Sequence, residues 1–161
     1  MEEFVLDAYF PEHITEILKN GEQQHLGGEC GELKNYTIEL LPKLRLHGEN
    51  VMKKLDLYTH IPQNITEILK EENNSIWIGE VKTLELGGYA VEILPKLRLH
   101  EENVMDEFIL RACRPGYFTE TLKKENKSIW IGKVKEVRLE GLAKEIENKL
   151  DFTLIEPDDQ E

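Results

Sequence analysis

The side chains best suited to chemistry in this sequence are histidines and cysteines. His47 and His100 occupy the same place in two copies of one motif. A ligand role would therefore have to occur twice, and a lone histidine is more often structural or exposed. Cys30 and Cys113 are the only cysteines, too few for a disulfide framework and without metal-ligand spacing. Cys113 has no glycine-rich elbow or orienting Asp–His pair nearby, so we expect a core residue and not a nucleophile.

The remaining candidates also favour structure over catalysis. Trp77 and Trp130 recur within Ile-Trp-Ile-Gly, and large apolar side chains at fixed repeat positions are usually core. The glycine pairs Gly27-Gly28 and Gly87-Gly88 lack the rest of a phosphate-binding or dinucleotide-binding fingerprint. The sequence therefore predicts no catalytic residues, no metal ligands and no cofactor, and we expect a protein that is not an enzyme.

Composition narrows the class of partner. The 161 residues contain 20 Lys and Arg against 32 Asp and Glu, which gives a net charge of −12. Binding to nucleic acid or to an anionic membrane surface needs clustered excess positive charge, so neither is expected as the partner. No apolar run approaches the roughly 20 residues that a membrane-spanning helix needs.

The compartment is predicted from the N-terminus and the cysteines. The first residues, Met-Glu-Glu-Phe, have neither the basic start nor the apolar stretch of a secretory signal, and few cysteines favour a reducing compartment. We therefore expect a cytoplasmic protein. Secretion with the signal already removed is the alternative, because four segments fit the glycosylation pattern. These begin at Asn35, Asn64, Asn73 and Asn126.

An internal repeat dominates the sequence. Residues Glu39–Met52 return as Glu92–Met105, with only two of fourteen positions changed and an offset of 53. The segment Ser75–Gly79 returns at the same offset as Ser128–Gly132. Matching Lys and Arg side chains recur along with the leucines, which indicates recent duplication. A fixed period of this kind is the signature of a repeat architecture.

Each 53-residue block divides into one long and one short unit. The spacing apolar-x-x-apolar-x-apolar starts at residues 1, 52, 81, 105 and 134, and one more start is expected near 28. Steps of about 29 and 24 residues alternate. We therefore predict one solenoid of about six units over residues 1–150, followed by an acidic tail over 151–161.

This pattern resembles the leucine-rich repeat family, whose unit is L-x-x-L-x-L-x-x-N/C-x-L. The best match runs from Val81 through Leu84 and Leu86, and the family's x-x-L-P continuation follows at Leu94-Pro95. The resemblance implies an α/β horseshoe with a parallel β-sheet on its concave face and short helices or extended segments on its convex face. The family's asparagine position is instead occupied by Tyr9, Tyr36, His60, Tyr89, Cys113 and Leu142.

The residue pattern supports the same architecture. Alternating apolar and polar residues are typical of a half-buried strand, and one such strand per unit can bury its apolar side only by stacking. In the long units, Ile65, Ile68 and Leu69 form a helical stripe after Pro62–Asn64, which predicts a short helix. In the short units, Leu97 and Leu99 alternate with polar residues and predict extended chain.

The exposed strand positions are the candidate binding site. Residues flanking the apolar positions point away from the core, onto the concave face. This face carries mixed charge with an acidic bias, and aromatic and arginine side chains are frequent anchors at protein interfaces. The candidate binding residues are Glu32, Asp56, Tyr58, Glu85, Ile109, Arg111 and Arg138.

We therefore expect a protein–protein interaction module whose partner is a protein with a basic patch. The alternative is a substrate-recognition or adaptor subunit of a larger complex, such as a ubiquitin-ligase receptor. Strand-like spacing begins at Met1 without a polar unit before it. We therefore expect one of three arrangements: the uncapped first repeat is covered by a partner, it is covered by a second copy in a homo-oligomer, or the chain is a piece of something longer. At the other end, a polar cap is predicted from Lys144, Glu145, Glu147 and Lys149.

Overall fold

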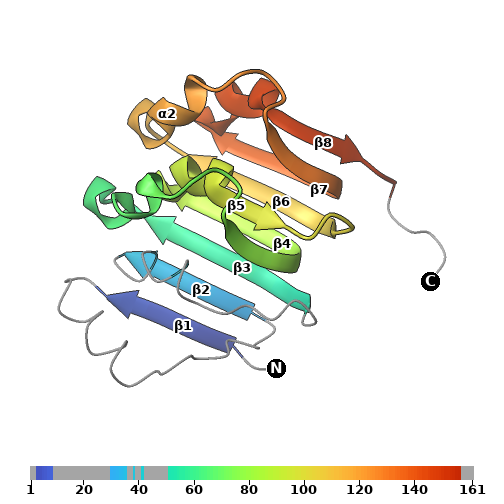
Figure 1. Ribbon diagram of the computed structural model, residues 1–161, viewed down its shortest axis with the longest axis horizontal. Helices are drawn as coiled ribbons and strands as arrows, with labels where there is room; N and C mark the ends of the chain where they lie inside the picture. Colours follow the sequence, from blue (N-terminus) through green and yellow to red (C-terminus); the bar gives the residue numbers. More distant parts are fainter. Residues whose placement is uncertain (1–2, 9–29, 36–37, 39–40, 42–50, 157–161) are drawn as a thin grey trace.

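A computed structural model describes residues 3–8, 30–35, 38, 41 and 51–156 (Figure 1). It is an α/β fold built on an open sheet of parallel strands, so the predicted parallel sheet is confirmed. Six strands follow one another across this sheet in chain order. They are β1 (Glu3–Ala8), β2 (Cys30–Asn35), β3 (Val51–Thr59), β4 (Ile76–Gly88), β6 (Val104–Ala112) and β7 (Ile129–Gly141).

The register of the strands places one leucine from each in a single row. Leu6 pairs with Leu33, and the row continues across the sheet through Leu57, Leu86, Leu110 and Leu139. Leu57, Leu86 and Leu110 are fully buried, and Leu139 is half-buried at the last strand. Because side chains alternate between the two faces of a strand, this row fixes which residues face the core in β3, β4, β6 and β7.

Two long strands bend sharply near their beginnings. Gly79 in β4 and Gly132 in β7 have φ values of +69° and +89°, which L side chains rarely adopt. Around each glycine, the strand pairs in parallel with a short strand. β5 (Leu97–Leu99) pairs with the start of β4 and lies off the main strand order, whereas β8 (Leu150–Leu154) pairs with β7 from Ile129 to Val134 and is the last strand of the main sheet.

Short helical turns connect the strands and cover the sheet. The helix predicted over residues 65–69 is instead two 3-10 turns, and Asn64 does not cap it, because its side chain donates to the Thr59 hydroxyl at 2.8 Å. The turns are η2 (Pro62–Ile65), η3 (Ile68–Lys70), η4 (Tyr89–Lys96), η5 (Pro115–Phe118), α2 (Thr119–Leu122) and η6 (Leu142–Lys149).

Buried polar side chains connect successive layers of the fold. The Glu92 carboxylate accepts hydrogen bonds from the backbone N–H groups of Glu120 and Thr121, at 2.9 and 3.0 Å, and from the Thr121 hydroxyl at 3.0 Å. The Asn103 amide is 2% exposed, and it both donates to and accepts from the backbone of Val81, at 3.2 and 3.0 Å. These contacts join residues 22 to 29 positions apart in the chain.

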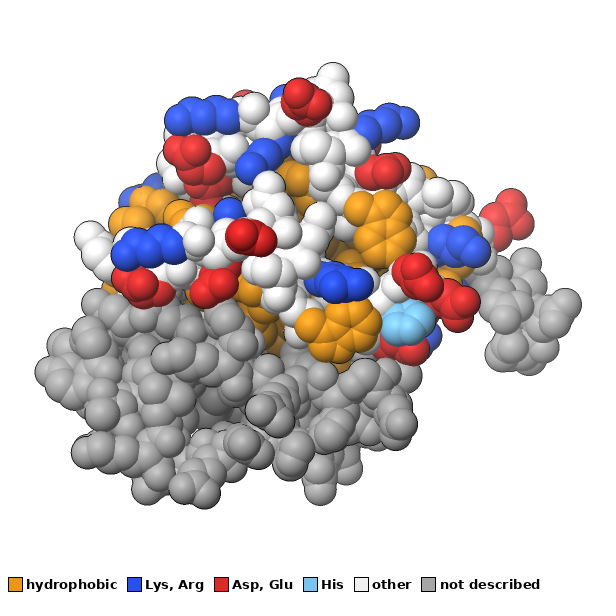
Figure 2. All heavy atoms as spheres, viewed as in Figure 1, with side chains coloured by type: hydrophobic (Ala, Val, Ile, Leu, Met, Phe, Trp, Pro, Cys, Tyr) orange, Lys and Arg blue, Asp and Glu red, His pale blue; other side chains and the backbone are white. Residues whose placement is uncertain are grey.

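Both tryptophans differ from the prediction that they are core residues. Trp130 is 44% exposed, and Trp77 is half-buried beside the Arg98 guanidinium, 5.7 Å from its ring centroid. The reason is strand alternation, because the isoleucines on either side of each tryptophan are the residues that point inward. In Figure 2, hydrophobic side chains accordingly emerge between acidic and basic ones on the molecular surface.

The C-terminal segment differs in part from the acidic tail expected over residues 151–161. Strand β8 extends into it and pairs with β7 as far as Leu154, and residues 157–161 lie outside the described residues. The predicted oligomerisation surface at Met1 also lies outside them. None of the helices in the described part of the chain is long and apolar enough to cross a bilayer.

Candidate functional site

The sheet aligns most of the predicted binding residues in two columns. Glu32, Asp56, Glu85, Ile109 and Arg138 are register partners on successive strands. The backbone of Glu32 lies in this register, whereas its side chain is outside the described residues. The second column lies two residues further along each strand and contains Tyr58, Gly87, Arg111 and Glu140. A third column, two residues before the first, contains Lys54, Thr83, Glu107 and Glu136. The three columns form the candidate site, which we call the concave face after the face of the predicted horseshoe to which these positions were assigned.

Ion pairs run across the concave face from strand to strand. The Glu85 carboxylate lies 2.9 Å from the Arg111 guanidinium and 3.6 Å from the Lys54 amine. Arg111 also donates to Glu140 at 2.9 Å, and Arg138 lies 3.4 Å from Glu107. The carboxylates of Glu140 and Glu85 together raise the pKa of Arg111 above its usual value. Much of the charge on this face is therefore compensated internally.

Two residues predicted to be exposed on the concave face are buried. Glu85 is 7% exposed because cations from both neighbouring strands close over its carboxylate. Ile109 is 4% exposed and lies on β6 between Glu107 and Arg111, each of which bridges to an adjacent strand. The prediction that Ile109 is a free apolar contact is therefore wrong, since the ion pairs enclose it.

A hollow of about 230 Å³ adjoins the concave face at the carboxyl ends of β3, β4, β6 and β7. Apolar and aromatic groups form most of its wall, and the charged groups Arg111 and Glu140 lie at its margin. Its lining residues are Tyr58, Gly88, Arg111, Ala112, Cys113, Tyr117, Glu140 and Gly141. Concave apolar sites with a few polar groups are where proteins most often bind ligand or partner side chains. We call this the tyrosine hollow.

The backbone glycines of β4 allow Tyr58 to reach the hollow. A Cβ atom added at Gly87 would lie 2.8 Å from the Tyr58 ring, so only glycine leaves room for the ring to lie across β4. The Tyr58 side chain remains 42% exposed. An exposed, rigid tyrosine beside a hollow is suited to contact a partner protein.

Tyr117 forms the opposite wall of the hollow. Its ring packs edge-on against Tyr89 with centroids 4.6 Å apart, and only 7% of the residue is exposed. Burial raises the pKa of the Tyr117 hydroxyl above its usual value. Tyr117 is thus a fixed part of the wall, whereas Tyr58 on the other side is accessible.

Cys113 is exposed, which corrects the prediction that it is a core residue. It follows the last residue of β6, where the chain leaves the sheet beside the tyrosine hollow. The inward position is instead taken by Ala112, which is 4% exposed. Within the described ranges, no group of three His, Cys, Asp or Glu side chains is placed to hold a metal ion.

Sequence reasoning found part of this site and missed part. Tyr58 and Arg111 were identified from strand alternation, and both lie at the hollow. Cys113 and Tyr117 were missed as site residues because they follow the strand. Their position just after the carboxyl end of a parallel strand is the signal that could have identified them, since such ends gather at one edge of a sheet.

Comparison of the chain with protein-family models, curated proteins and solved structures gives no match.

Proposed function

We propose that this chain is a solenoid of the leucine-rich repeat type that binds a protein partner and has no catalytic role. The partner contacts the concave face and inserts an apolar side chain into the tyrosine hollow. The observation that carries the proposal is the position of the hollow, directly beside columns of side chains held in register by four parallel strands. Such a rigid surface is suited to recognition by shape and charge.

The solenoid is supported by equivalent elements 53 residues apart. Strands β4 and β7 both have 13 residues, and turns η4 and η6, which follow them, both have eight. The left-handed residues also recur at this offset: Asn74 and Lys127, Gly79 and Gly132, Gly88 and Gly141. These similarities between positions one 53-residue block apart support a stack of similar coils.

Charge supports a basic partner. The described charged residues of the concave face are three cations, Lys54, Arg111 and Arg138, and five carboxylates, Asp56, Glu85, Glu107, Glu136 and Glu140. The whole chain has a net charge of −12. A basic protein surface is attracted to such a face, and complementary charge accelerates association. The exposed free Cys113 fits a reducing, cytoplasmic compartment.

Affinity capture from the native cell followed by calorimetry with the identified partner tests this proposal. Tyr58→Ala removes the exposed ring at the hollow, and we expect it to weaken binding by about tenfold or more, as for an interface anchor. Arg138→Glu replaces an exposed cation of the concave face with a carboxylate, so it should strengthen the binding of a basic partner. The matched control is Arg98→Glu on β5, which makes the same change outside the main sheet.

Unchanged affinity in both Tyr58→Ala and Arg138→Glu would place the binding surface elsewhere and overturn the proposal. Circular dichroism of each variant establishes that it is folded. Glu85→Lys is less suitable, because it would place a third cation between Lys54 and Arg111. A thermal-shift screen against metabolites tests the enzyme alternative, since a small molecule that stabilises the chain and is converted by it would contradict a purely binding role.

A further inference from the structure

We propose that the outer edge of β7, from Lys135 to Gly141, binds an extended basic segment of a partner protein as an added parallel strand. This site lies at the end of the sheet and shares only Glu140 and Gly141 with the lining of the tyrosine hollow. It extends the proposed function by a second contact surface, and it stands on the backbone pairing of β7, which does not depend on the concave face being a binding site.

The first observation is an unpaired strand edge. β6 pairs with β7 along the whole length from Val104↔Lys133 to Ala112↔Gly141. On the other side, β8 pairs with β7 only as far as Leu154↔Val134, and the Ile155 N–H then donates to Val134 at 3.0 Å. In the part of the chain that the structure describes, no strand pairs with this side of β7 beyond Val134. The edge therefore offers free N–H and C=O groups to an extended segment.

The second observation is the exposure of core side chains at this edge. Val137 and Leu139 are half-buried, whereas the residues at the same positions in β4, Leu84 and Leu86, are fully buried. The difference arises because β4 has a strand on both sides over this stretch, β3 and β6. A strand added beside β7 would bury Val137 and Leu139 further.

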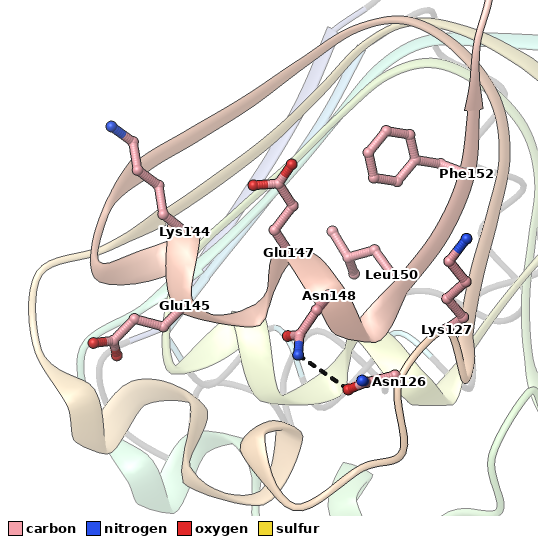
Figure 3. Close-up of a pocket in the computed structure, with 8 residues that line it drawn as sticks. All are labelled: Asn126, Lys127, Lys144, Glu145, Glu147, Asn148, Leu150 and Phe152. Atoms are coloured by element: carbon pink, nitrogen blue, oxygen red, sulfur yellow. Dashed lines mark hydrogen bonds between the residues drawn. The ribbon is translucent and has the colours of Figure 1, made fainter.

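The turn that follows β7, η6, is too polar to pack against a further repeat unit. Val91, Leu94 and Pro95 are buried in η4, and the residues 53 positions later are Lys144, Glu147 and Asn148. Together with Leu150 and Phe152, they line a hollow of about 750 Å³ (Figure 3). Leu150 and Phe152 face into this space, whereas Lys144 points outward. The polar turn therefore leaves the β7 edge as the more suitable place for an added segment.

Charge determines which segment fits. On the side of β7 that belongs to the concave face, Glu136, Arg138 and Glu140 follow one another along the edge. Glu136 is exposed and has no ion pair among the described residues, while Arg138 already pairs with Glu107 and Glu140 with Arg111. A parallel strand with Lys or Arg opposite Glu136 and Glu140 would complement this edge. A second copy of this chain fits less well, because each copy has a net charge of −12 and the two repel.

The chain itself provides the probe. Strand β6 pairs in parallel with β4, so a synthetic peptide with the sequence Val104–Ala112 has the shape required beside the equivalent strand β7. In the corresponding register, its residue 111 faces Glu140 and its residue 107 faces Glu136. The test peptide carries Glu107→Lys, which places a cation at both positions. The control peptide keeps Glu107 and carries Arg111→Glu.

Fluorescence anisotropy and hydrogen exchange measure the result on the full chain. We expect the test peptide to bind more tightly than the control and to slow exchange of the backbone N–H groups over 135–141. Glu136→Lys in the protein should lower its affinity for the test peptide by about two- to fivefold, the range expected for an exposed ion pair. Glu72→Lys, the same charge change in the exposed turn before β4, should leave its affinity unchanged.

Three outcomes would overturn the inference. Equal affinity of the two peptides would show that charge does not determine binding. Slowed hydrogen exchange confined to the tyrosine hollow would place the peptide elsewhere. A dimer of the chain whose formation protects 135–141 would identify a second copy as the occupant. None of these outcomes bears on the effect of Tyr58→Ala on the concave face, so the two proposals can fail separately.

Discussion

Tyr117 is the residue whose chemistry depends most directly on the fold. Because burial raises its pKa, the folded chain resists its ionisation, whereas the unfolded chain ionises it near the usual value of 10.0. The free energy of unfolding therefore decreases as the pH rises through 10. Below that pH, the ionisation of Tyr117 does not change it. We expect Tyr117→Phe to reduce this alkaline loss, measured by urea unfolding on either side of pH 10.

Tyr58→Phe is the control for this experiment, because it removes a hydroxyl from an exposed ring at the same hollow. Tyr58→Phe should retain most of the alkaline loss, because the burial of Tyr117 is its main cause. An alkaline loss that is the same in wild type, Tyr58→Phe and Tyr117→Phe would show that other groups cause it, and that burial of Tyr117 does not.

For single residues, the sequence predicted which side chains are buried better than it predicted the hydrogen-bond partners of polar side chains. Alternation correctly identified the buried leucines, and applied to Ile-Trp-Ile it would also have placed Trp77 and Trp130 outside. The pattern could not show that Asn103 supplies the backbone hydrogen bonds of Val81, because those partners lie 22 residues apart and meet only in the folded chain. The repeated Asn50 and Asn103 were the available signal.

At the scale of elements, Glu92 tests how much the hydrogen bonds between η4 and α2 stabilise the fold. Its carboxylate accepts three hydrogen bonds from the start of α2. Glu92→Ala would leave buried donors without an acceptor, and we expect it to lower the free energy of unfolding by about 1–3 kcal/mol. The measurement is urea unfolding followed by circular dichroism.

The chain contains its own control for Glu92. Glu145 lies 53 residues later at the equivalent place in η6, where it is exposed. Glu145→Ala should change the free energy of unfolding by less than about 0.5 kcal/mol, as for an ordinary surface substitution. Equal losses in Glu92→Ala and Glu145→Ala would mean that the hydrogen bonds to α2 contribute nothing particular to stability.

Among the elements, strands were more predictable than the connections between them. The apolar spacing identified the segments that form the parallel sheet, since a two-residue period is a local property of the chain. The spacing did not show that β4 and β7 begin earlier and bend at Gly79 and Gly132. The bend depends on pairing with β5 and β8, which lie about 20 residues further along the chain. The tyrosine hollow was also beyond prediction, because it forms where four strand ends meet.

At the scale of the whole molecule, the proposed stack of layers predicts that stability depends on position along the stack. Each layer contacts only its neighbours, so a side chain at the end of the stack is covered on one side and a central one on both. Leu86 in β4 is fully buried, whereas Leu139, at the same position in β7, is half-buried.

We expect Leu86→Ala to cost about 2–5 kcal/mol as a core truncation, and Leu139→Ala to cost clearly less. Urea unfolding of the two variants measures the difference. Equal losses would contradict a layered core and would indicate that the β7 end is as enclosed as the centre of the sheet.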